Sequence, residues 1–143
     1  MSKKDLLRIS SAIAFLFAVG HTLGGRQYWS PMGDNPVLQM MRAVHFQTMG
    51  VSRSYFDFFM GFGYALSVSG VLQACVLWQM GTIAEKDFSL VRPLVLANMV
   101  AVAFGGVISW IFIFPIPAAF SIILFVSLGC ALVLGQARGG RGL

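Results

Sequence analysis

Four long apolar stretches dominate this chain and limit what it can fold into more than any other feature. Each runs for about 20 residues or more, the length that a helix needs to cross a hydrocarbon layer of roughly 30 Å. The sequence therefore predicts an all-α fold, a bundle of four transmembrane helices. The four predicted helices are Leu6–Gly25, Tyr55–Met80, Leu90–Phe114 and Ile116–Leu134.

The composition excludes an ordinary soluble domain. Hydrophobic residues make up 57% of the 143 residues and charged residues only 10%, whereas a soluble domain has about 25% charged residues. No soluble core could hide this much apolar surface, and the length suits a single membrane domain over residues 1–143. The first stretch lacks a clear small-residue cleavage site, so we expect it to remain as a helix rather than serve as a signal peptide.

The basic residues are distributed unevenly between the two sides of this predicted bundle. Seven of the ten Lys and Arg residues fall on the side of both termini, and three fall on the opposite side. Because cytoplasmic segments are enriched in Lys and Arg, both termini are expected in the cytoplasm. We interpret the net charge of +5 as part of this membrane-surface asymmetry, because no basic stripe with interleaved aromatics indicates nucleic acid as a partner. The seven are Lys3, Lys4, Arg8, Lys86, Arg92, Arg138 and Arg141; the three are Arg26, Arg42 and Arg53.

The connection between the first two predicted helices contains local signals of its own. Asn35 followed by Pro36 is typical of an N-cap and the first position of a helix, and Gly50 is a typical helix stop. These signals predict a short, moderately amphipathic helix over Pro36–Met49, lying outside the membrane along the outer face of the bundle. At the other end of the chain, the Gly- and Arg-rich tail, residues 136–143, is expected to be disordered.

Two ionisable residues stand out within the apolar stretches, and such residues are functional candidates because they are costly in a membrane. His21 and Asp57 are each expected about one turn from the outer end of their helices, and so at the same depth. A pair of this kind could act as a catalytic acid and base on a lipid-soluble substrate. The alternative is structural: Asp57 pairs with Arg53 where its helix begins, and His21 donates to a loop carbonyl.

A candidate ligand pocket surrounds this pair. If the helix includes Arg53, then Arg53, Gly61 and Tyr64 share the face of Asp57, with Gly61 leaving space and Tyr64 offering a hydroxyl. Several phenylalanines flank this polar stripe, which suits a mostly apolar pocket with a few placed polar groups. The candidate ligand-binding residues are His21, Trp29, Arg53, Asp57, Gly61 and Tyr64.

Metal and haem binding are weaker alternatives, and the sequence predicts no resident cofactor. Met41, His45 and Met49 would follow one another at four-residue spacing on the loop helix, and thioether with imidazole suits copper(I). His21 and His45 could in principle hold a haem from two sides. The haem alternative requires matched depth in two spanning helices, which the predicted position of His45 in the loop helix does not supply.

Four sets of residues resemble a group of small bacterial four-helix inner-membrane proteins that carry no assigned reaction. They are Gly20-His21-Thr22, Trp29-Ser30-Pro31, Phe46 with Met49-Gly50, and the run from Arg53 to Gly63. In layout the chain is also distantly similar to DoxX-like inner-membrane proteins, which are loosely tied to redox partners, although this chain has no redox motif. The layout likewise resembles the emopamil-binding, sterol-isomerase-like fold, whose sites use several acidic residues where this chain offers one. The resemblance implies a four-helix bundle in the bacterial inner membrane.

The sequence thus favours a binding or accessory membrane protein. Its outer-leaflet pocket would take a small apolar or lipid-like ligand, or a partner subunit. A membrane enzyme that uses His21 and Asp57 is the competing hypothesis. A third possibility is an assembly subunit, within a homo-oligomer or a larger membrane complex.

Overall fold

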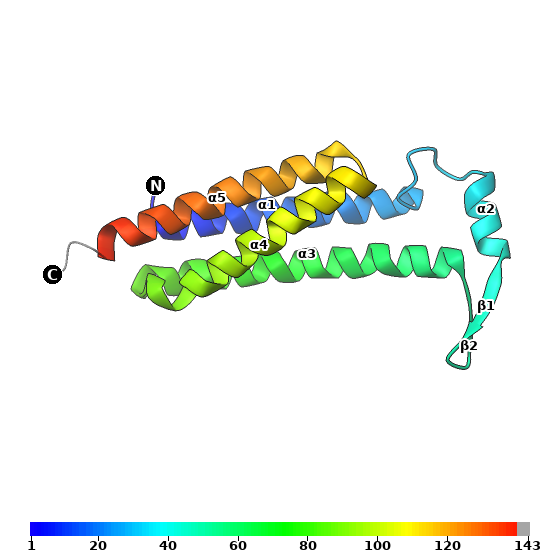
Figure 1. Ribbon diagram of the computed structural model, residues 1–143, viewed down its shortest axis with the longest axis horizontal. Coiled ribbons are helices and arrows are strands. Elements are labelled where there is room, and N and C mark those ends of the chain that lie inside the picture. Colours follow the sequence, from blue (N-terminus) through cyan, green and yellow to red (C-terminus); the bar gives the residue numbers. More distant parts are fainter. Residues whose placement is uncertain (140–143) are drawn as a thin grey trace. The chain divides into compact units, whose positions relative to one another are not determined.

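The computed structural model describes the backbone of residues 1–139 and the side chains up to residue 135. Four long helices account for most of it, and a short helix and a β-hairpin lie between the first two (Figure 1). The long helices are α1 (Lys3–Gly24), α3 (Tyr55–Lys86), α4 (Phe88–Phe112) and α5 (Pro115–Gly139). The other elements are a 3-10 turn η1 (Gly25–Gln27), α2 (Pro36–Ala43), β1 (His45–Thr48) and β2 (Val51–Ser54).

The four long helices are each long and apolar enough to cross a membrane, as the sequence predicted. Large apolar side chains such as Phe62 and Phe112, which are 72% and 77% exposed, cover their outer surfaces. An apolar surface of this extent needs lipid around it. The chain is therefore a multi-pass membrane protein.

Two helices extend beyond their predicted ends. The α3 helix has 32 residues, or about 48 Å at 1.5 Å per residue, which exceeds a hydrocarbon layer of roughly 30 Å. The α5 helix continues to Gly139. The prediction of a disordered tail is therefore wrong for residues 136–139, and residues 140–143 lie outside the described part of the chain.

Side-chain caps determine where several helices begin. Ser2 and Asp5 cap the start of α1 reciprocally, because each backbone N–H donates to the side chain of the other residue. At the start of α4, the Asp87 carboxylate accepts from the backbone N–H of Ser89. Each cap satisfies backbone donors that a helix start otherwise leaves unpaired.

The chain divides into two compact units, and the first contains residues up to Phe17 together with the chain from Val71 onward. In this unit α4 and α5 run antiparallel (Figure 1), and Phe88 near the start of α4 packs over Gly135 near the end of α5. Leu7, Leu77 and Leu128 are fully buried in its core. Buried serines add polar contacts between helices: Ser10 to Ser127, and Ser11 to the Ala74 carbonyl at 2.7 Å.

The second unit, Ala18–Gly70, contains the end of α1, the connection and the first half of α3. Its two helices approach closely where a Cβ on Gly70 would come within 3.0 Å of the Ala18 Cβ. Small residues at such crossings allow membrane helices to pack through their backbones. Gly70 and Ala18 therefore form a close packing contact between the end of α1 and the first half of α3.

The connection differs from its prediction. The α2 helix begins at Pro36, and Asn35 caps it by accepting from the N–H groups of Val37 and Leu38. The helix ends at Ala43, however, so the predicted helix over Pro36–Met49 is wrong in its second half. That half folds into the antiparallel hairpin β1–β2, with His45 opposite Ser54. Gly50, at φ +82°, lies in the hairpin turn and stops no helix.

Candidate functional site

Asp57 lies in the first turn of α3 and forms part of a capping box. Its carboxylate accepts from the backbone N–H of Ser54 at 2.8 Å, and its own N–H donates to the Ser54 hydroxyl at 3.1 Å. This reciprocal pair satisfies donors at the helix start. The carboxylate thus fixes the boundary between β2 and α3. The structural alternative had expected an ion pair between Asp57 and Arg53 in this role.

Arg53 lies in β2 and not in α3, so it does not share a helical face with Asp57. Its helical spacing from Asp57 is therefore wrong, although the two residues are still neighbours. The Arg53 guanidinium donates to the Ser52 carbonyl at 2.8 Å, and the side chain is exposed. Its charge is consequently available to a group from outside the protein.

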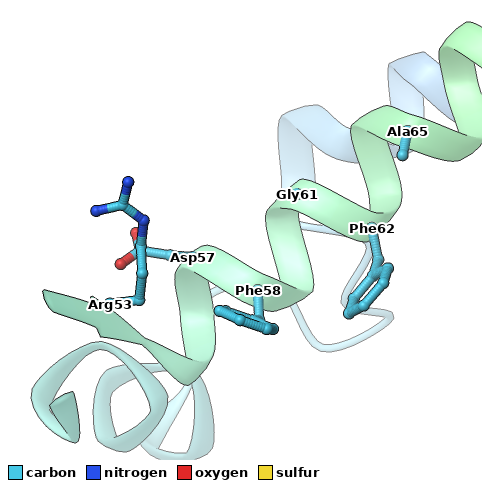
Figure 2. Close-up of a pocket in the computed structure, with 6 residues that line it drawn as sticks. All are labelled: Arg53, Asp57, Phe58, Gly61, Phe62 and Ala65. Carbon is cyan, nitrogen blue, oxygen red and sulfur yellow. The ribbon is translucent and has the colours of Figure 1, made fainter. Parts of the chain in front are cut away.

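An open groove of about 360 Å³ follows the first turns of α3 (Figure 2). Arg53 and Asp57 stand at the end of the groove where the helix begins, and the rings of Phe58 and Phe62 project along it. Gly61 contributes space, because a Cβ at this position would meet no atom within 4 Å. The groove therefore has a charged end and an apolar wall. The complete lining is Arg53, Asp57, Phe58, Gly61, Phe62 and Ala65.

His21 belongs to a different cluster, which is centred on Trp29. The His21 Nε2 lies 3.0 Å from the Gly63 carbonyl, and because a carbonyl only accepts, Nε2 is the nitrogen that carries the proton. The Trp29 indole N–H donates to the His21 carbonyl at 2.7 Å, and its ring stacks on the His21 ring with centroids 5.2 Å apart. Tyr64 packs edge-on against the same indole at 5.2 Å.

The structure thus separates the predicted site residues into two groups. Arg53, Asp57 and Gly61 line the groove, whereas His21, Trp29 and Tyr64 form the cluster around the indole. Asp57 exchanges hydrogen bonds with Ser54, whereas His21 contacts Gly63 and Trp29.

All five Asp and Glu side chains are engaged by other protein groups. Two form ion pairs, with Lys4 and Arg42, and three accept hydrogen bonds from serines next to helix starts. None of these arrangements resembles a pair of carboxylates or a histidine and carboxylate prepared for proton transfer. The five pairs are Asp5 with Ser2, Asp34 with Arg42, Asp57 with Ser54, Glu85 with Lys4, and Asp87 with Ser89.

The structure does not place the three residues of the copper(I) alternative on one helix, as that alternative required. Met41 is in α2, His45 is in β1, and Met49 is at the hairpin turn, so the three residues share no helix. The Nδ1 of His45 lies 3.1 Å from the Ala43 carbonyl. Within residues 1–139, no group of three or more His, Cys, Asp or Glu side chains could hold a metal ion.

Sequence reasoning missed Ser54 and Ala65. The Ser54-Tyr55-Phe56-Asp57 run before an apolar stretch matches the capping-box pattern, so the role of Ser54 could have been found. Ala65 carried no distinctive signal, because apolar residues occur throughout a membrane helix, whereas Phe58 and Phe62 are among the phenylalanines expected to flank the polar stripe.

Comparison of the chain with protein-family models, with curated proteins and with solved structures gives no match. The site must therefore be interpreted from its own geometry.

Proposed function

We propose that this protein binds an amphiphilic, lipid-like ligand in the groove along the start of α3. The head of the ligand would meet Arg53 and Asp57, and its apolar part would lie against Phe58 and Phe62. The observation that carries the proposal is the distribution of charge in the groove, which is confined to one end. Apolar walls with a few placed polar groups are typical of small-molecule sites.

The proposed setting is the bacterial inner membrane, with both termini in the cytoplasm. The excess of Lys and Arg on the side of the termini supports this orientation. The start of α3 and the groove then face the outer leaflet. The α2 helix would lie along the outer surface as a short amphipathic helix: Val37 and Met40 are 68% exposed, and Leu38 is buried.

Binding is better supported than catalysis. The Asp57 carboxylate already accepts a backbone hydrogen bond, and a proton-transfer role would compete with that cap. The groove, in contrast, requires no rearrangement to admit a ligand, because it is open and Gly61 leaves it unobstructed. The resemblance to DoxX-like proteins is compatible with an accessory role of this kind.

Native mass spectrometry of the protein purified in detergent tests the proposal. We expect the wild type to retain a molecule of lipid mass, and Gly61→Leu to retain about tenfold less, equivalent to a loss of about 1.4 kcal/mol. The leucine side chain would occupy the space that the glycine leaves in the groove. Gly105→Leu in α4 is the matched control, because a Cβ there also meets nothing within 4 Å.

Equal retention by the two variants and the wild type would refute a ligand in this groove. If the wild type instead carries a protein subunit that Gly61→Leu releases, the occupant is a partner chain and the lipid-like ligand is refuted. Arg53→Gln adds a test of the charged end: it should weaken the retention of an anionic or zwitterionic molecule while leaving the fold unchanged.

A further inference from the structure

The side chain of Arg8, in α1, is held in place by its neighbours. It belongs to the compact unit that does not contain the groove. The stem of its side chain passes over Gly81 of α3, where a Cβ would come within 3.3 Å of the Arg8 Cγ. Its guanidinium then lies over the ring of Trp78, with the Arg8 Cζ 4.5 Å from the ring centroid. Close approach over a glycine and stacking on an aromatic face together hold the guanidinium plane in place.

This guanidinium donates to no protein acceptor among the residues that the structure describes. Its Nε is buried and has no hydrogen-bond partner. The nearest carboxylate to consider is Glu85, which already forms an ion pair with Lys4. Among the described residues, Glu85 attracts Arg8 only at longer range, and the other four Asp and Glu side chains have partners of their own, so Arg8 has no hydrogen-bonded counter-ion there.

The surroundings of Arg8 indicate a lipid rather than a small soluble anion. Trp78 is half exposed, and side chains such as Trp and Arg gather where a membrane helix meets the headgroups. Deeper along the same two helices, Phe15 of α1 and Val71 of α3 are exposed and apolar. A phosphate at Arg8 would thus have apolar surface beside it on the side toward the hydrocarbon layer.

We propose that Arg8 and Trp78 form a binding site for the phosphate of an anionic phospholipid. The terminal nitrogens of Arg8 donate to two phosphate oxygens, a geometry that a planar guanidinium matches well. The neighbouring basic residue Lys3 adds positive charge at this end of α1. The site is independent of the groove, so either one can fail without the other.

The test is native mass spectrometry of the purified protein titrated with phosphatidylglycerol or with phosphatidylcholine. We expect the wild type to retain phosphatidylglycerol in preference, and Arg8→Gln to reduce this preference by about twentyfold, because hydrogen bonds to a charged phosphate are lost as well as the charge. Arg92→Gln removes the same charge from the exposed start of α4 and serves as the control. It should reduce the preference by no more than about fivefold, the effect of one basic side chain at a membrane surface.

Trp78→Leu and Arg8→Lys keep the charge but remove the stacked, planar arrangement, so both should retain phosphatidylglycerol less well than the wild type. These variants also decide the matter if Arg8→Gln fails to fold. Equal effects of Arg8→Gln and Arg92→Gln would overturn the proposal, because general charge would then explain the preference. Displacement of the lipid by excess inorganic phosphate would overturn it as well, in favour of a site for small anions.

Discussion

The packing of Trp29 against Gly63 makes a sharp prediction about two glycines in the same helix. A Cβ on Gly63 would overlap the six-membered ring of the Trp29 indole, whereas a Cβ on Gly61 would meet no atom within 4 Å. Gly63→Ala and Gly61→Ala are therefore chemically identical changes, two residues apart, in opposite surroundings. Their difference isolates the contact with Trp29.

The expected magnitude follows from two independent estimates. Replacing Gly by Ala in a helix interior stabilises by about 0.8–1 kcal/mol, and both variants share this gain. If Trp29 stays, the extra methyl group overpacks the contact and costs about 1–3 kcal/mol. If Trp29 leaves, its hydrogen bond to the His21 carbonyl and its ring stacking are lost, at about 1 kcal/mol each. Either route makes Gly63→Ala less stable than Gly61→Ala by about 2 kcal/mol.

Reversible unfolding in mixed detergent micelles, followed by circular dichroism, measures this difference. Circular dichroism is preferable to tryptophan fluorescence because Trp29 itself changes its surroundings in one variant. Two variants of equal stability would show that the indole does not lie over Gly63, and the cluster of Trp29 with His21 would have to be abandoned.

Three further predictions concern other parts of the chain. Met49 has a positive φ of 49° in the hairpin turn, so Met49→Asn should stabilise the hairpin by about 1 kcal/mol, seen as slower hydrogen exchange of β1; unchanged exchange would contradict the turn. Hydrogen bonds from the Ser89 hydroxyl and, second, from the Ser89 backbone N–H lower the pKa of Asp87. The ionised carboxylate therefore stabilises the fold above about pH 4, and this stabilisation is lost as the pH falls through the lowered pKa. Asp87→Asn should flatten the acid limb of a curve of unfolding free energy against pH. The amide of Gln73 donates to Asn98 at 3.4 Å between α3 and α4. Gln73→Leu should lower the free energy of unfolding by only about 0.6 kcal/mol. A loss several times larger would contradict a role for this pair as a single hydrogen bond between helices.

The spanning helices could be predicted because their signal is local. Length and apolar composition determine whether a segment can cross a membrane, whatever surrounds it. Their ends depended on contacts that sequence does not display. Gly81 was expected in a loop, but it lies within α3, where its missing side chain leaves room for Arg8.

The connection shows how a correct start signal can lead to a wrong end. The Asn35 cap began α2 as predicted, and Gly50 looked like a helix stop at the right distance. The residues between them include β-branched and aromatic side chains that suit strands, and Phe46 packs against Tyr55 and Phe58 with centroids 5.1 and 5.3 Å apart. Two-residue hairpin turns favour Asn-Gly or Asp-Gly, so the sequence Met49-Gly50 did not indicate a hairpin turn.

The site was predicted in part for a similar reason. Counting residues along two helices can place His21 and Asp57 at one depth, but it cannot show on which side of α3 each partner lies. Asp57, Gly61 and Ala65 follow one another at four-residue spacing on the side of the groove. Gly63 presents its carbonyl to His21. Depth alone could not separate these two sides.

Because the Asp57 carboxylate caps the start of α3, variants that leave this cap in place give the most informative test of the groove. Removing Asp57 would remove the capping box, and such a loss costs about 1 kcal/mol of stability by itself, so a ligand lost from that variant could reflect a disturbed helix start. Gly61→Leu leaves the cap in place and changes only the space beside it. Arg53→Gln likewise leaves the hydrogen bonds between Ser54 and Asp57 intact. A binding defect in these two variants, with the helix start preserved, would therefore be due to the groove itself.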